Sequence, residues 1–134
     1  MSDEPETGAR PSLPGLDADG IEETRHLLDI LDLIAAERLR LHGGDEQGAV
    51  MRLLLRQMIA GDNNGMPLLR LARLAGCPRE TLRRKLGPLL NRGYLVQDEA
   101  GRYHCGAAYF ADSASARQRI LAALRQFMAP AARD

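Results

Sequence analysis

The order of apolar and polar residues predicts a helical chain interrupted by one short pair of strands. From residue 20 to residue 42, apolar side chains recur at three- and four-residue spacing, which is typical of a helix with one face against a core. Asp19 is expected to cap its start, and Gly43–Gly44 to end it. The apolar set comprises Leu27, Leu31, Ile34 and Leu41, widened by Leu28, Ile30, Leu33 and Leu39. A face this broad needs more than one neighbouring element.

After this helix, turn residues separate several shorter helical patterns. Glycine, proline and asparagine cluster at the breaks, as expected of turns. The stretches "YLVQ" and "RYHC" have strand-like composition and flank the loop "DEAG", which predicts a hairpin. The predicted elements are helices over 45–60, 67–75, 78–92 and 113–128, and strands over 94–97 and 102–105. Residues 1–19 are rich in proline, glycine and acidic side chains, and we expect a disordered acidic tail.

Composition narrows the class of protein. The chain has 134 residues, which suits one compact domain with tails, and 45% of them are hydrophobic. Aromatic residues make up only 4% and tryptophan is absent, so the core is expected to be aliphatic. No apolar run approaches the roughly 20 residues that span a bilayer, and no signal peptide opens the chain. We therefore expect a cytoplasmic protein with no membrane partner.

The net charge is zero, but the charges are distributed unevenly. Residues 1–32 hold nine acidic side chains against two arginines, whereas residues 67–105 hold eight basic side chains against three acidic ones. Such asymmetry indicates a localised basic face. Arginines on an arbitrary helix usually mark only a solvated surface, so the surrounding residues must decide between the two interpretations.

Those surrounding residues follow the pattern of two helices joined by a tight turn. Ala72 is small where the helices must approach, and Gly76 stands where the first helix must end, often with a positive φ. Pro78 is suited to start the second helix, because its missing N–H has no helical partner there. Leu82 and Leu86 then return to contact the first helix. The spacing predicts a helix-turn-helix, and the hairpin after it predicts a wing.

The stretch "PRETLRRKL", followed by "RGYL", resembles bacterial winged helix-turn-helix transcriptional regulators. The added helices before and after this core resemble the MarR-like layout. The resemblance implies a mainly α fold, with a three-helix core, a two-stranded wing and terminal helices for dimerisation. The implied organisation is a tail (1–19), an N-terminal dimerisation helix (20–44), a DNA-binding core (45–110) and a C-terminal dimerisation helix (111–134).

Helical geometry then selects the side chains expected to meet DNA. Leucines define the buried side of the helix over 78–92, so polar and basic residues occupy the other side. Arginine can bind guanine through two hydrogen bonds, and cations also bind phosphates. We expect Arg79, Thr81 and Arg84 to reach base edges or nearby phosphates, Arg83 and Lys85 to bind the backbone, and Arg102 on the wing to contact a flanking phosphate or the minor groove.

Pro88 departs from the usual pattern of a recognition helix. A proline inside a regular helix costs about 3 kcal/mol, because its ring clashes with the preceding turn and it cannot donate a hydrogen bond. We therefore expect a kink or break near residues 85–87. The reading segment would then be 78–86, and Asn91 becomes a doubtful base contact.

The sequence favours a sequence-specific DNA-binding regulator that acts as a homodimer on double-stranded DNA. The alternative is a winged-helix adaptor that binds protein and no DNA. No catalytic arrangement, cofactor motif or metal-ligand spacing stands out, so an enzyme is not expected. Whether the terminal helices dimerise or pack on their own core, whether Cys77 or Cys105 has a redox role, and which effector binds, if any, stay open.

Overall fold

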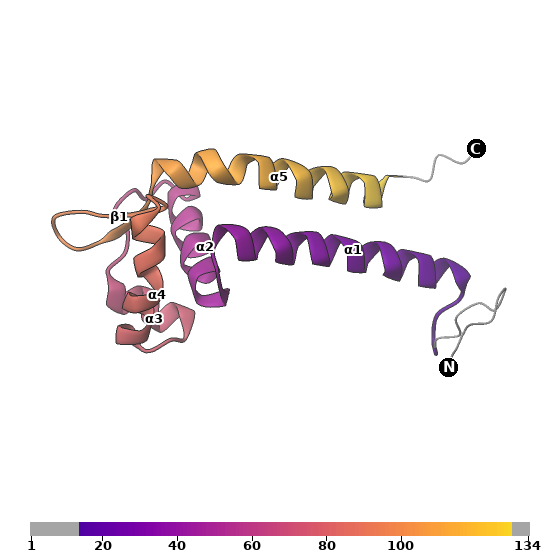
Figure 1. Ribbon diagram of the computed structural model, residues 1–134, viewed down its shortest axis with the longest axis horizontal. Helices are drawn as coiled ribbons and strands as arrows, with labels where there is room; N and C mark the ends of the chain where they lie inside the picture. The colour runs from indigo at the N-terminus through magenta and orange to yellow at the C-terminus, as the bar shows by residue number, and fades with distance from the viewer. Residues whose placement is uncertain (1–13, 130–134) are drawn as a thin grey trace.

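The computed structural model describes residues 14–129 and contains five helices and a two-stranded antiparallel sheet in that range (Figure 1). The elements are α1 (Ala18–Leu41), α2 (Asp45–Ile59), α3 (Leu68–Ala75), α4 (Arg79–Asn91), β1 (Leu95–Gln97), β2 (Tyr103–Cys105) and α5 (Ala107–Met128). The prediction of a mainly helical fold with one small sheet is confirmed. Most of the tail expected over 1–19 lies outside the described residues, and α1 already begins at Ala18.

Helices α2, α3 and α4 and the sheet form a compact body around an aliphatic core. Leu82, Leu86 and Leu89 on one side of α4 are at most 1% exposed. They share the core with side chains from the other elements, chiefly Val50, Met51, Leu54, Leu71, Leu95 and Tyr103. Burying a leucine of this kind contributes about 2 kcal/mol, so the leucines fix which side of α4 faces outward.

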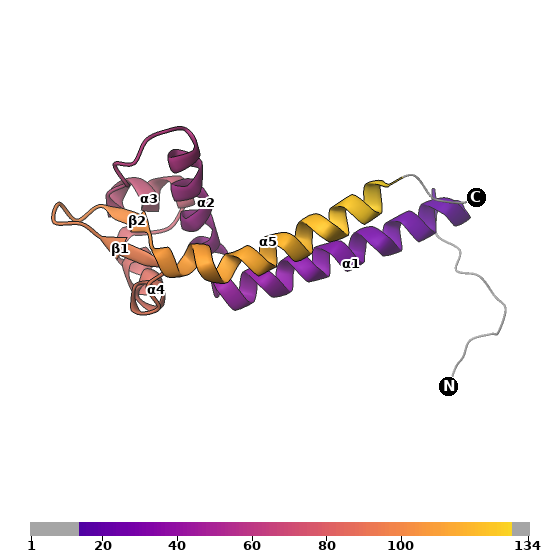
Figure 2. The same cartoon turned by 90° about the horizontal axis from the view of Figure 1, so that it is seen from above.

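Helices α1 and α5 run antiparallel and side by side, and together they form an arm that extends away from the body (Figures 1 and 2). Near the far end, the rings of His26 and Phe127 meet edge to face, with centroids 5.1 Å apart. Nearer the body, Arg119 lies 2.7 Å from Glu37. The two terminal helices therefore cover part of each other within one chain.

The start of α1 differs slightly from the prediction. Asp17, and not Asp19, is the N-cap, because its carboxylate accepts the backbone N–H of Gly20 at 2.7 Å. The predicted stop is confirmed: Gly43 has φ +90°, and its N–H returns to the carbonyls of Arg38 and Leu39. A left-handed residue of this kind favours glycine.

The tight turn between α3 and α4 has the predicted geometry. Gly76 ends α3 with φ +68°, and the N–H of Cys77 bonds to the carbonyl of Ala72 at 3.0 Å. Ala72 is buried at 4% exposure, as expected of a small residue where helices approach. Pro78 is the residue just before α4 and not its first turn, so it sets the entry angle of the helix.

Of the kink or break expected near residues 85–87, the break is wrong, because α4 is one uninterrupted helix with Pro88 inside it. Gly87 explains why the helix continues. A residue before proline normally avoids the helical region because its Cβ and N–H meet the proline ring, and glycine has no Cβ. Leu86 and Leu89 are buried on either side of Pro88 and hold the segment against the core. The carbonyl of Pro88 also accepts the N–H of Arg92 at 3.1 Å.

The sheet closes the body and leads directly into α5. Leu95 pairs with Cys105 and Gln97 with Tyr103 in antiparallel register, and an isolated bridge adds Met66 beside Tyr103. Helix α5 begins at Ala107, earlier than the predicted start at residue 113, because no turn separates it from the sheet. Its first turn is anchored by Tyr109, which is 6% exposed.

The left-handed conformation of Gly76 yields a stability prediction. No atom of the described residues lies within 4 Å of a Cβ at this position, so Gly76→Ala adds backbone strain without a clash there. We expect it to lower the free energy of unfolding by about 1 kcal/mol, measured by urea denaturation. Gly76→Asn is the matched control and should lose less, because asparagine tolerates this conformation. Equal losses in both variants would contradict a backbone origin.

Candidate nucleic-acid interface

The outer side of α4 carries the basic residues singled out from the sequence. Arg79, Arg83 and Arg84 are exposed, while Thr81 and Lys85 are half-buried. The opposite side of the helix is held by buried leucines, so these side chains share a polar surface. The expected separation of a core side from a basic side is therefore present.

Two of these cations already have carboxylate partners. Arg83 donates from Nε to Glu80 one turn earlier at 2.9 Å, with a second bond from its terminal nitrogen. This arginine is the main reason that the pKa of Glu80 lies below its usual value. Lys85 lies 3.1 Å from Glu46 and so links α4 to the start of α2. Contacts from Arg83 or Lys85 to a phosphate would have to replace or share these pairs.

Arg79 and Arg84 differ from their neighbours. Within residues 14–129, neither guanidinium has an ion-pair partner. Arg84 follows Arg83 directly but points to a different sector of the helix, about 100° further round. These two arginines are therefore the cations of α4 that are most available to an external anion.

Arg102 lies where β2 begins, and its side chain turns back onto the protein. Its guanidinium donates to the carbonyls of Asn64 at 2.9 Å and Gly65 at 3.5 Å. Gln57 on α2 donates to the same Gly65 carbonyl at 2.9 Å. In this geometry Arg102 stabilises the loop before α3. Its expected contact with a flanking phosphate remains a prediction.

Asp98 organises the tip of the hairpin between β1 and β2. Its carboxylate accepts the backbone N–H groups of Ala100 at 3.0 Å and Arg102 at 2.9 Å, and it lies 2.8 Å from the ring of His104. The bond from His104 is the main reason that the pKa of Asp98 lies below its usual value. The sequence signal was present, since aspartate commonly caps such turns, but we had not assigned it a role.

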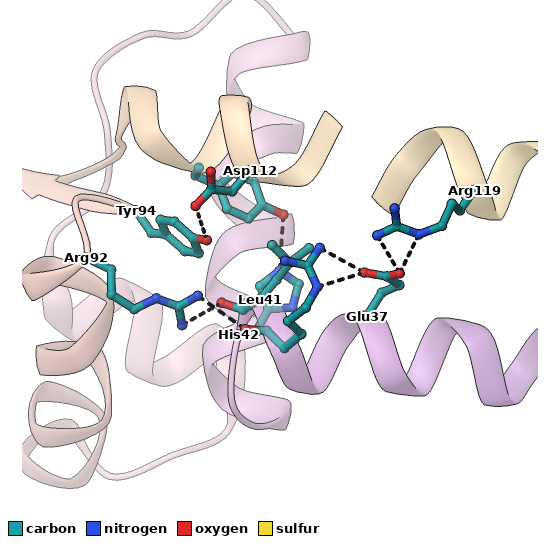
Figure 3. Close-up of polar contacts among 9 residues, drawn as sticks. Glu37, Leu41, His42, Arg92, Tyr94, Asp112 and Arg119 are labelled. Carbon is teal, nitrogen blue, oxygen red and sulfur yellow. Dashed lines mark hydrogen bonds and ion pairs between the residues drawn. The ribbon is translucent and has the colours of Figure 1, made fainter. Parts of the chain in front are cut away.

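Arg92 connects the body to the arm (Figure 3). Its guanidinium donates to the carbonyls of Arg40 and Leu41 at 3.2 Å each, at the end of α1. The same group lies over the ring of Tyr94, 4.2 Å from its centroid. The hydroxyl of Tyr94 donates to Asp112 of α5 at 2.6 Å. In the sequence Arg92 is one of the eight basic side chains of residues 67–105, and no local pattern predicts these contacts.

Glu37 is a buried carboxylate between the two helices of the arm, 8% exposed (Figure 3). It accepts hydrogen bonds from Arg40 at 2.9 Å and Arg119 at 2.7 Å. These arginines, with Arg40 the larger cause, lower the pKa of Glu37 and keep it ionised. The sequence reasoning missed this residue, although an acidic side chain between apolar helix positions was its signal.

His42 is buried where α1 meets α5. Its Nε2 lies 3.1 Å from the hydroxyl of Tyr109, and its Nδ1 has no hydrogen-bond partner among the described residues. Burial, reinforced by Arg38, Arg52 and Arg92, lowers the pKa of His42 to about 4. The ring is therefore neutral near pH 7.

An apolar groove of about 320 Å³ lies beside this histidine, between α1 and α5. Leu41, Leu55 and Phe110 contribute to its wall, and the Oγ of Ser113 is buried without a hydrogen-bond partner in the described part of the chain. The sequence leaves open whether an effector binds. A small apolar effector would require an apolar space at the junction of arm and body, and this groove is such a space.

The cysteines have the features of structural thiols. Cys77 is half-buried and packs against the core. Burial raises the pKa of Cys105 to about 11, so its thiol is protonated near pH 7. Because the thiolate is the reactive form, this environment disfavours a redox role for Cys105. Residues 14–129 contain no group of histidine, cysteine and acidic side chains that could hold a metal ion, and no helix in this range is long and apolar enough to cross a membrane.

Comparison with known proteins adds no relative. No protein-family model matches the sequence, and no curated protein or solved structure matches it. Only the residues and the geometry of this chain therefore indicate its function.

The buried His42 yields a pH prediction. The pKa of His42 is near 6.5 in the unfolded chain and about 4 in the folded protein. As the pH falls, the unfolded chain is therefore protonated at this residue before the folded protein is. The stability contributed by the neutral ring is present above pH 6.5 and is lost as the pH falls toward 4. We expect about 2 kcal/mol of loss between pH 8 and pH 5 from this group. His42→Gln, which does not titrate, should show a shallower pH dependence in urea denaturation; identical slopes would contradict the assignment.

Proposed function

We propose that this protein is a sequence-specific DNA-binding transcriptional regulator of the winged helix-turn-helix class that acts as a homodimer. The observation that carries the proposal is the outer side of α4, where Arg79 and Arg84 are exposed and have no ion-pair partner among residues 14–129, on a helix whose other side is fixed by buried leucines. In this proposal α3 and α4 are the helix-turn-helix, and β1 and β2 are the wing. A protein of this kind acts in the cytoplasm and is not an enzyme.

The mechanism follows from a difference among the cations of α4: Arg83 and Lys85 have carboxylate partners, whereas Arg79 and Arg84 have none among residues 14–129. An α-helix fits the DNA major groove, where arginine can donate two hydrogen bonds to one guanine. Arg79 and Arg84 are the first choice for such contacts, with Thr81 beside them. Arg83 and Lys85 would contact phosphates by exchanging a protein carboxylate for a phosphate oxygen. The wing would lie over the adjacent backbone.

The homodimer is supported by apolar side chains that the arm leaves exposed. Leu28, Leu31 and Leu39 of α1 are 54%, 50% and 69% exposed and follow each other along one stripe of the helix. Leu27 of α1 and Leu121 and Met128 of α5 are further exposed apolar side chains of the arm. The α1–α5 pairing covers other parts of both helices, so packing within one chain accounts for only part of the apolar surface.

Charge also favours a second copy of the chain as the partner of the arm. Helix α1 carries six acidic side chains against three arginines, whereas α5 carries one acidic side chain against three arginines. An isologous dimer presents the same patch twice, so α1 of one copy can meet α5 of the other. Opposite charges would then surround a shared apolar centre.

The alternative function is a winged-helix adaptor that binds a protein and no DNA. The ion pairs of Arg83 with Glu80 and Lys85 with Glu46 favour this alternative, because they leave fewer cations available for phosphate. An adaptor would bind no duplex with sequence preference and would co-purify with a defined protein. One experiment, the selection of DNA duplexes by the purified chain, therefore distinguishes the two functions.

DNA binding is tested by selecting duplexes from a random library with the purified full-length chain. We expect a preferred pseudo-palindrome whose affinity falls steeply with salt, because cations displace counterions from phosphates. Arg79→Ala with Arg84→Ala should weaken binding to the selected duplex about tenfold or more, measured by fluorescence anisotropy.

The matched control removes two arginines far from the body, by Arg25→Ala with Arg125→Ala. It should leave affinity and sequence preference nearly unchanged, provided that its solution mass matches the wild type. Equal losses in the two double variants would reject the assigned face of α4. Failure to select any sequence with the wild-type chain would reject DNA recognition itself.

The dimer is tested by sedimentation at micromolar concentration. The wild type should sediment as a dimer, and Leu28→Glu with Leu31→Glu should shift it to monomer, because two charges would be buried without partners. Circular dichroism should show unchanged helix content, since both positions are exposed within one chain. If the wild type is a monomer, or if this change leaves the dimer intact, the proposal that the arm forms the dimer interface is rejected.

A further inference from the structure

The polar contacts of Arg92 complete the end of α1. The last four carbonyls of a helix have no partner within the helix. In α1, those of Arg38 and Leu39 accept the backbone N–H groups of His42 and Gly43. The remaining two, of Arg40 and Leu41, accept hydrogen bonds from the guanidinium of Arg92, the residue that follows α4. The side chain that follows α4 thus satisfies the end of α1.

The same guanidinium also reaches the start of α5 through Tyr94. Tyr94 is 2% exposed, its ring lies under the guanidinium, and its hydroxyl donates to Asp112. The backbone of Tyr94 contributes as well, since its N–H bonds to the carbonyl of Leu89 in α4 at 2.9 Å. Arg92 and Tyr94 therefore join α4 to both helices of the arm (Figure 3).

Arm and body are joined by two short connections: Gly43–Gly44 between α1 and α2, and Gly106 between β2 and α5. The first does not by itself set the direction of α1, because Gly43 has φ +90° and no described residue lies within 4 Å of a Cβ position there. Glycine pairs allow many backbone directions. Two hydrogen bonds from one guanidinium that also stacks on a ring are directional. They can therefore select one of these backbone directions.

We propose that Arg92 is a positioning residue that fixes the orientation of α4 relative to the α1–α5 arm, and thereby the separation of the two DNA-reading helices in the dimer. This inference rests on the proposed function. The arm joins the two copies, so the angle between arm and body determines where each α4 lies. Arg92 acts through this angle and not by contacting bases, because its guanidinium is turned toward the end of α1.

The test compares Arg92→Lys with wild type on three kinds of duplex: the selected palindrome, palindromes with one or two base pairs added or removed between half-sites, and a short duplex with a single half-site. Lysine keeps the charge but cannot form the fork or the flat stack. We expect single half-site affinity within about twofold of wild type, full-site affinity about tenfold lower, and a weaker preference for the selected spacing.

Two further variants complete the design. Tyr94→Phe keeps the ring and removes only the bond to Asp112, so it should weaken the spacing preference in the same direction. Arg70→Lys, on the exposed side of α3, makes the same chemical change elsewhere in the basic region and should leave the spacing preference intact.

The outcomes separate this inference from the proposed function. If Arg92→Lys keeps the wild-type spacing preference, the positioning role is rejected while DNA recognition stands. If it weakens half-site and full-site binding equally, Arg92 acts at the DNA or on the fold, and the inference is again rejected. If the wild-type chain binds no duplex selectively, the proposed function fails and this inference fails with it.

Discussion

The burial of Leu82, Leu86 and Leu89 is the constraint on which the other features of α4 depend. These three side chains anchor one side of the helix in the aliphatic core, so the orientation of the other side is fixed without any further interaction. The same anchoring lets the helix pass through Pro88, whose local cost is smaller than the free energy of burying the leucines on either side of it. The basic surface of α4 is therefore a consequence of apolar packing.

Electrostatic pairing then divides that surface into cations of different availability. Glu80 and Glu46 hold Arg83 and Lys85, the loop before α3 holds Arg102, and Arg79 and Arg84 remain without ion-pair partners in the described residues. A net charge summed along the sequence cannot show this division. The pairs also mean that the chain can keep a local excess of cations without strong repulsion between neighbouring guanidinium groups.

Local patterns predicted the elements well, because helix periodicity, glycine turns and the hairpin loop are encoded by neighbouring residues. The extra turns of α5 before residue 113 were not predicted, because Tyr109 anchors them in a core built by distant segments. The unbroken α4 was not predicted either, because it depends on the core contacts of Leu86 and Leu89 as well as on Gly87. Helix geometry predicted the exposed positions of Arg79, Arg83 and Arg84, but it did not predict the contacts of the other polar residues. Arg92 and Glu37 owe their roles to contacts with Leu41 and Arg119, far away in sequence, and no spacing rule reveals such pairs.

The length of the arm has a mechanical consequence. Helix α5 has 22 residues, which corresponds to about 33 Å at 1.5 Å per residue. A rotation of only about 5° at the junction would displace the far end of such a rod by roughly 3 Å, close to the rise between neighbouring base pairs along one DNA strand. In the proposed dimer on DNA, a rotation too small to disturb the core at the junction would therefore shift the far end of the arm by about one base step.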